Sequence, residues 1–299
     1  LVMIRPQINN MTGELGAIVG LLIPPSNNMI IYSAASRIGV SIGDLFLAGI
    51  LPGVMTAALL MFVAWRVAVL RGYASGAFTG WRSFTRALLF AIPGLMTAII
   101  IIGGILSGIF TATESSAIAV IYTIAIGALV YRTLGWKRFF EAAMQSVKIT
   151  AMVLLIIGAA TAFGYALAIL EAPAKLADMI TSATSNPILV LLIVNVILLV
   201  LGTFMDMSPL IIITTPILLP VVMEVGVDPV HFGIVMMLNL GIGLVTPPVG
   251  SVLFVGSAVG KVPVEQAVKT IWPFYGALLL ALMIITFVPA LSLTLPSLF

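Results

Sequence analysis

The chain contains no cysteine, and only 8% of its residues are charged. Without cysteine it forms no disulfide, and thiolate catalysis and cysteine-ligated metal sites are excluded. Soluble domains carry roughly 25% charged residues, whereas this chain is 62% hydrophobic and has a mean hydropathy of +1.27. A soluble core has no room for so much apolar surface, so we expect the chain to lie in a lipid bilayer.

Charge-free apolar runs are long enough to cross a membrane, which takes about 20 residues per helix. These runs cover residues 87–113, 149–170, 179–205, 232–260 and 270–299. Transmembrane barrels show short alternating segments instead. The sequence therefore predicts an all-α polytopic membrane protein, with residues 1–299 forming one transmembrane domain.

The net charge of +3 does not indicate nucleic-acid binding, because the basic residues gather at the ends of apolar runs. Residues 66–86 and 132–148 are rich in Arg and Lys, so the positive-inside rule places both on the cytoplasmic side. The stretch 136–140 (WKRFF) is either a short interfacial helix or a solvated loop. The remaining pattern predicts helices at 44–66, 86–110, 115–131, 147–170 and 270–292, and interrupted segments at 14–36, 187–222 and 229–258.

Two parts of the chain repeat each other around a double proline. Residues 20–25 (GLLIPP) reappear as 243–248 (GLVTPP), and each copy continues through apolar sequence to a lone base, Arg37 or Lys261. An acidic residue follows in each copy, Asp44 or Glu265, and a proline stands at the same distance beyond it. The repeat-related segments are 20–52 and 243–273.

Broken apolar segments in corresponding places are typical of the binding site of a secondary transporter. The alternative is that the prolines only kink ordinary membrane helices, which helix bundles tolerate. The second copy is preceded by several more helices than the first. We therefore expect that the functional protein extends beyond the N-terminus of this chain.

Asp206 is the single acidic residue that we expect to be buried in the apolar region. An ionised Asp at mid-membrane costs about 2.5–3.5 kcal/mol on insertion scales, so it normally faces a cavity, a cation or a base. No base lies in the neighbouring runs, and the hydroxyls of Thr203 and Ser208 suit Na⁺. The alternative is that Asp206 only caps the helix that follows it.

The two double prolines interrupt backbone hydrogen bonding and leave the preceding carbonyls without partners. The candidate Na⁺ ligands here are the carbonyls of Leu22, Ile23, Val245 and Thr246, together with the hydroxyls of Ser26 and Thr246. The half-helices that start after the breaks present positive dipole ends, which favour carboxylates. Since no base lies within the apolar runs, we expect an anionic substrate to be neutralised by helix ends and co-bound Na⁺.

Several other polar residues have competing interpretations. Asn27 and Asn28 either bind substrate or cap a half-helix, and Asn239 is a candidate partner for backbone freed by the second break. Thr111 and Glu114 fit a capping box. His231 follows Asp228-Pro229, a helix start with Asp as N-cap, and is expected at the membrane interface.

Enzyme classes lack their required residues. An intramembrane aspartyl protease needs two facing aspartates, and no serine protease motif surrounds Ser251 or His231. A metal site lacks its usual ligands, and no nucleotide-binding loop is present. The chain is therefore predicted not to be an enzyme.

The sequence resembles the large membrane subunit of the TRAP (tripartite ATP-independent periplasmic) transporters, of which it would form the C-terminal two-thirds. The resembling segments are 20–26 with 29–32, 45–53, 103–114, 202–206 and 238–250. They occur in the family's order and span nearly the whole chain. The chain departs from the family at Asn27-Asn28, in residues 1–11 and in lacking the leading helices.

The resemblance implies an elevator-type, Na⁺-coupled symporter of the bacterial inner membrane, with an ion-transporter-like inverted repeat and two re-entrant helical hairpins. It also implies a small four-helix membrane subunit and a periplasmic binding protein that delivers a C4-dicarboxylate, sialic acid or related carboxylate. The alternative function is a non-transporting scaffold or assembly subunit that inherited the repeat.

The family's sites lie around the double prolines and transfer to these neighbourhoods of the chain, together with the Asp206 region. The candidate substrate-binding residues are Ser26, Asn27, Asn28, Thr246, Pro247, Pro248 and Gly250. The candidate Na⁺ ligands are Thr203, Asp206, Ser208, Ile23, Pro24, Gly243, Val245 and Thr246.

Overall fold

The computed structural model describes residues 16–72, 80–171, 186–248, 250–260 and 263–298, together with Lys175. All regular structure in these ranges is helical. The chain divides into two compact units, one drawn from 1–76 and 160–299 and the other from 77–159. Lys261, the base of the second repeat, lies outside the described residues, as does Val249 of the second break.

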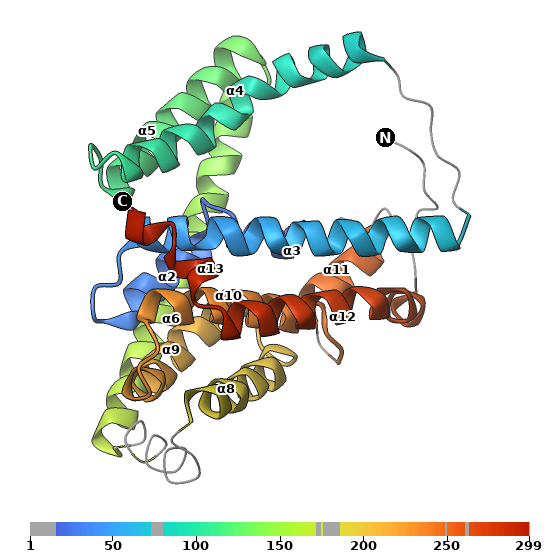
Figure 1. Ribbon diagram of the computed structural model, residues 1–299. Helices are drawn as coiled ribbons and strands as arrows, with labels where there is room; N and C mark the ends of the chain where they lie inside the picture. The colour runs from blue at the N-terminus through green and yellow to red at the C-terminus, as the bar shows by residue number, and fades with distance from the viewer. Residues whose placement is uncertain are drawn as a thin grey trace. The chain divides into compact units, whose positions relative to one another are not determined.

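The larger unit contains the two repeat-related segments and the interrupted segments (Figure 1). It begins with a short helical arm, Gly16–Leu22, which we call the first arm. Its helices are then α2 (Asn27–Ser36), α3 (Ile42–Leu70), α8 (Pro187–Gly202), α9 (Met207–Glu224), α10 (Pro229–Val245), α11 (Ser251–Gly260), α12 (Val264–Phe287) and α13 (Ala290–Leu293), followed by a 3₁₀ turn at Pro296–Leu298.

Helix α10 forms the centre of this unit. Every residue from His231 to Val245 is buried, and the helix contacts α8, α9, α12 and α3. This stretch has no Lys, Arg, Asp or Glu, and a helix that is apolar all round belongs in a core. As predicted, Asp228 caps its start and accepts hydrogen bonds from the amides of Val230 (2.8 Å) and His231 (3.2 Å).

The smaller unit is built on a pair of contacting helices, α4 (Trp81–Leu106) and α5 (Ala112–Ala125), the second continuing as a π-helical turn at Ile126–Val130. The Tyr122 hydroxyl donates to the Pro93 carbonyl (3.0 Å) and the Tyr131 hydroxyl donates to the Phe90 carbonyl (2.8 Å). The predicted capping box is confirmed, because Thr111 and Glu114 exchange both of its hydrogen bonds at the start of α5.

Helix α6 (Trp136–Ile169) corrects the interpretation of residues 136–140. The sequence left this stretch as a separate interfacial helix or a loop, but it forms the first turns of one long helix. Trp136 stacks on Phe139, with ring centroids 5.7 Å apart, and meets Phe140 edge-on at 5.2 Å. These contacts join aromatic residues at helical spacing, which favours continuation over a break.

The described helices fit a polytopic membrane protein. Five are long and apolar enough to cross a bilayer: Ile42–Leu70, Trp81–Leu106, Ala112–Val130, Trp136–Phe163 and Met207–Glu224. A sixth span results if the first arm and α2 are taken together, and α8, α10 and Ile271–Phe287 are shorter apolar helices. Helix α12 starts at Val264, earlier than the start predicted at 270 for the final span.

Candidate functional site

The predicted breaks occur at both double prolines. The first arm ends at Leu22 and α2 begins at Asn27. Helix α10 ends at Val245 and α11 begins at Ser251. The peptide bond between the two prolines is cis at Pro24-Pro25 and at Pro247-Pro248.

The first break is a bend in a continuing segment. The axes of the first arm and α2 differ by 44°, whereas a re-entrant hairpin reverses the chain. Gly241 and Gly233 both belong to α10. A side chain on Gly241 would press on Ile18 and Leu21 of the first arm, and a side chain on Gly233 would press on Tyr32 of α2. The segment therefore advances along α10, and the hairpin predicted at this break is not what the described residues form.

A reversal occurs instead between α8 and α9. Gly202 of α8 lies against Gly243 of α10, and the Asn239 amide of α10 donates to the Asn195 carbonyl of α8 (2.9 Å), so α8 runs parallel to α10. Helix α9 runs the other way, since Thr215 contacts Met236 (3.6 Å) and α9 starts beside the end of α8. Residues 203–206 are thus the tip of a helical hairpin.

This hairpin tip brings predicted residues from both halves of the chain together. Asn28, at the start of α2, donates from its Nδ2 to the Met207 sulfur (3.2 Å). Ser208, at the start of α9, donates from its hydroxyl to Asn28 Oδ1 (3.2 Å). The N-termini of α2 and α9 therefore meet, and we call the set Ser26, Asn28, Asp206 and Ser208 the N-terminal junction.

Ser26 and Asp206 occupy the N-cap positions of the two helices, yet neither side chain caps its helix. The Ser26 hydroxyl is buried and has no hydrogen-bond partner within the described part of the chain. The Asp206 carboxylate likewise has no described partner, and it is exposed, which corrects the expectation that it is buried. Both oxygens are thus available to a ligand.

Asn27 lies beside the junction but is exposed, with no described hydrogen bond from its side chain. At the first break Pro24 is buried, while Ile23 is 39% exposed and its amide continues the first arm by donating to the Val19 carbonyl (3.0 Å).

The second break distributes its freed carbonyls among several donors. The Thr246 hydroxyl donates to the Ile242 carbonyl (2.7 Å), and the Thr246 amide donates to the Gly243 carbonyl (3.0 Å). The Val245 carbonyl accepts from the Tyr275 hydroxyl of α12. Pro247 and Pro248 are exposed, and Gly250 is buried with a φ of 22°.

Gly250 fits closely over the end of α10. A Cβ on Gly250 would lie 2.9 Å from the Thr246 carbonyl oxygen and 3.2 Å from that of Leu244. Its positive φ also favours a residue without a side chain.

A cavity of about 560 Å³ adjoins the second break. Thr203 of the hairpin tip, Thr246 and Pro247 line it together with Trp272 and Tyr275 of α12. The rest of its lining is aliphatic or aromatic, from α8, α10, α12 and Phe204 of the hairpin tip. The cavity therefore connects the two predicted neighbourhoods of Thr203 and Thr246.

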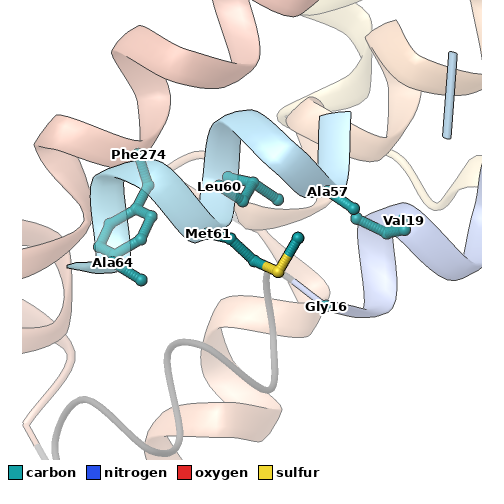
Figure 2. A pocket seen from close by; sticks show the side chains of 7 residues that line it. All are labelled: Gly16, Val19, Ala57, Leu60, Met61, Ala64 and Phe274. Carbon is teal, nitrogen blue, oxygen red and sulfur yellow. The ribbon is translucent and has the colours of Figure 1, made fainter. Parts of the chain in front are cut away.

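A second cavity, of about 250 Å³, lies between the first arm, α3 and α12 (Figure 2). Figure 2 shows that its labelled side chains carry only carbon, apart from the sulfur of Met61. Without a polar group it offers nothing to orient a charged ligand, and we assign it no site.

Sequence reasoning missed a buried polar network across α8, α10 and α12. Asn239 donates to Asn195 Oδ1 (2.7 Å), and Asn195 donates to the Thr286 hydroxyl (3.0 Å). His231 Nε2 lies 3.4 Å from the Thr286 carbonyl. His231 is 2% exposed and therefore lies in the protein core. Asn239 binds α8 rather than backbone freed by the break.

The chain matches the family described as "Tripartite ATP-independent periplasmic transporter, DctM component" over residues 14–291. It is 39% identical to the C4-dicarboxylate TRAP transporter large permease protein DctM of Pseudomonas aeruginosa, covering 93% of this chain and 65% of the relative. It is also 39% identical to the sialic acid TRAP transporter large permease protein SiaM of Vibrio cholerae, over 94% of this chain and 66% of the relative. A Salmonella typhimurium protein, YgiK, is 44% identical over 98% of this chain and 67% of the relative.

This chain belongs to the DctM family of TRAP transporter permeases, which confirms the resemblance. Its relatives are transporter components and not enzymes, in agreement with the exclusion of enzyme chemistry. The family and the apolar helices together define a multi-pass membrane protein. The chain spans about two thirds of the length of these relatives.

Proposed function

We propose that this chain is part of the permease subunit of a secondary, Na⁺-coupled symporter that imports an organic acid. The observation that carries the proposal is the N-terminal junction, where the starts of α2 and α9 meet beside a buried hydroxyl without a described partner. The substrate class is a C4-dicarboxylate, sialic acid or a related carboxylate, the first two being named for relatives.

The electrostatics of the junction support an anionic substrate. Unsatisfied amides and the helix dipole make a helix N-terminus favourable for an anion, and two such termini converge here. The sequence has no Lys or Arg between Lys175 and Lys261, nor in residues 14–36. A carboxylate at this place is therefore stabilised by helix ends and by a co-bound cation rather than by a base.

Oxygens at the junction and at the second break support the proposed Na⁺ coupling. Na⁺ is a hard cation that takes oxygen ligands. The Asp206 carboxylate, which does not cap α9, and the Ser26 hydroxyl both lack a described hydrogen-bond partner. The hydroxyls of Thr203 and Ser208 and the carbonyls at Ile23, Pro24, Gly243, Val245 and Thr246 complete the candidate set. A cation here offsets the charge of both Asp206 and the substrate.

The family membership supports the rest of the assembly. We infer a small four-helix membrane subunit and a periplasmic binding protein as partners, and the bacterial inner membrane as the location. The two repeat-related segments lie in one compact unit, which suits an elevator mechanism in which that unit moves as one body.

The test is uptake of labelled C4-dicarboxylate or sialic acid into proteoliposomes that contain the full-length subunit with its membrane partner and binding protein. We expect uptake to require an inward Na⁺ gradient and to fall to background when K⁺ replaces Na⁺. Equal uptake in Na⁺ and K⁺ would refute the coupling, and no uptake of any organic acid would refute the function.

A further inference from the structure

The two double-proline breaks are held in different ways although their sequences repeat. At the first break, a Cβ on Gly49 of α3 would lie 2.1 Å from the Leu22 carbonyl oxygen. A Cβ on Gly53 would lie 2.6 Å from the Ile23 side chain. The end of the first arm therefore packs directly on the backbone of α3, and only glycine leaves room for it.

At the second break the end of the helix is held by a side-chain hydroxyl instead of by backbone packing. Val245 corresponds to Leu22 in the repeat, and its carbonyl accepts a hydrogen bond from Tyr275. Aligning Pro52 with Pro273 places Val54 opposite Tyr275 in the first copy, and valine has no donor. The hydrogen bond from α12 to the break is thus a feature of the second copy alone.

The position of this hydrogen bond connects it to the proposed site. Tyr275 lines the 560 Å³ cavity together with Thr246 and Pro247, and its ring meets Trp272 edge-on with centroids 5.8 Å apart. A carbonyl oxygen has two lone pairs, so Val245 can accept from Tyr275 and still coordinate a cation. The peptide joining Val245 and Thr246 is held at both of its polar groups, because the Thr246 amide donates to the Gly243 carbonyl (3.0 Å) and the Val245 carbonyl accepts from Tyr275.

We propose that Tyr275 is a positioning residue for the second break, which orients the Val245 carbonyl for Na⁺. This inference rests on the proposed Na⁺ coupling and assigns a role within it to a residue outside both breaks. It predicts that removing the hydroxyl alone weakens Na⁺ binding, because the peptide of the Val245 carbonyl then loses one of the two hydrogen bonds that hold it, while the ring keeps its packing.

The experiment compares Tyr275→Phe with Tyr32→Phe in the full-length subunit with its partners. Tyr32 is the matched control, since its buried hydroxyl also donates to a backbone carbonyl, that of Pro229 (2.7 Å), at the opposite end of α10. Two quantities are measured: the Na⁺ concentration for half-maximal uptake, and the Na⁺-dependent rise in melting temperature of the purified protein.

We expect Tyr275→Phe to raise the Na⁺ concentration for half-maximal uptake by about tenfold, which corresponds to the net contribution of one hydrogen bond. The Na⁺ concentration that gives half of the rise in melting temperature should increase by the same factor. Tyr32→Phe should lower the melting temperature without changing either Na⁺ midpoint. Unchanged Na⁺ midpoints in Tyr275→Phe, or equal shifts in both variants, would overturn the inference. Absence of any Na⁺ effect on the unmodified protein would refute the coupling itself, a distinct outcome.

Discussion

Individual glycines of the repeat have different surroundings despite their equivalent positions. Gly20 and Gly243 open the two copies of the double-proline motif. A Cβ on Gly20 would meet no atom within 4 Å, whereas one on Gly243 would lie 2.6 Å from the carbonyl carbon of Gly202. Only the second glycine is required by a close helix crossing, that of α8 and α10.

The first prediction uses this pair. Gly243→Ala should destabilise the protein by about 1–3 kcal/mol, because the added methyl pushes α8 away from α10. Gly20→Ala should be neutral or stabilising by up to about 1 kcal/mol, since alanine favours a helix more than glycine. Melting of the purified variants in detergent measures both, and equal melting temperatures would show that the crossing is not close.

At the scale of elements, the start of α2 and the start of α9 form the proposed site although they are far apart in the sequence. Their meeting rests on Asn28, which contacts both Met207 and Ser208. The chain has no cysteine, so cysteines introduced here report on this contact alone, once the rest of the full-length subunit is also cysteine-free.

The second prediction is that Asn28→Cys combined with Ser208→Cys forms a disulfide under mild oxidation, because side chains in contact suit the short reach of that bond. The control combines Ser208→Cys with Ser33→Cys, which lies more than a turn further along α2. The cross-link is detected on a gel. A subunit cut by a protease between residues 28 and 208 migrates as one band when the disulfide joins its fragments and as two bands when it does not. Equal cross-linking of both pairs, or none at 28 and 208, would contradict the junction.

Much of the element order was predictable because proline, glycine and capping residues mark helix ends locally. The breaks at 23–26 and 246–250, the gap before Met207 and the caps at Thr111 and Asp228 were all read from such signals. Proline alone was less reliable: Pro216 and Pro220 lie inside α9 without ending it.

The site was harder to predict, because it depends on how distant helices pack. The sequence singled out Asn28 and Ser208 separately but contains no local signal that they touch. The reversal of the chain at residues 203–206 was missed for the same reason. A helical hairpin and a bent membrane span have similar amino-acid compositions. The burial of His231 follows from its packing beside Thr286 of α12, a contact that no sequence spacing encodes.

At the scale of the whole molecule, the chain consists of two compact units with different burial. The larger unit holds the buried stretch His231–Val245 of α10 and every predicted site residue. In the smaller unit, no residue of α4 is buried, although the helix is strongly apolar. Such a surface suits lipid or an apolar partner subunit, which agrees with a multi-pass protein that works in an assembly.

Two aspartates of the larger unit test whether Na⁺ binds at the hairpin tip. Asp206 and Asp228 both stand at helix N-caps, but only Asp228 caps its helix. Asp228→Ala should therefore cost about 1 kcal/mol of stability and leave Na⁺ dependence intact. Asp206→Ala should fold normally because no described hydrogen bond is lost.

The most direct measurement is Na⁺-stimulated uptake by these two variants in proteoliposomes with the full-length subunit and its partners. We predict that Asp206→Ala abolishes the stimulation and that Asp228→Ala retains it. Undiminished Na⁺ stimulation in Asp206→Ala would contradict the account.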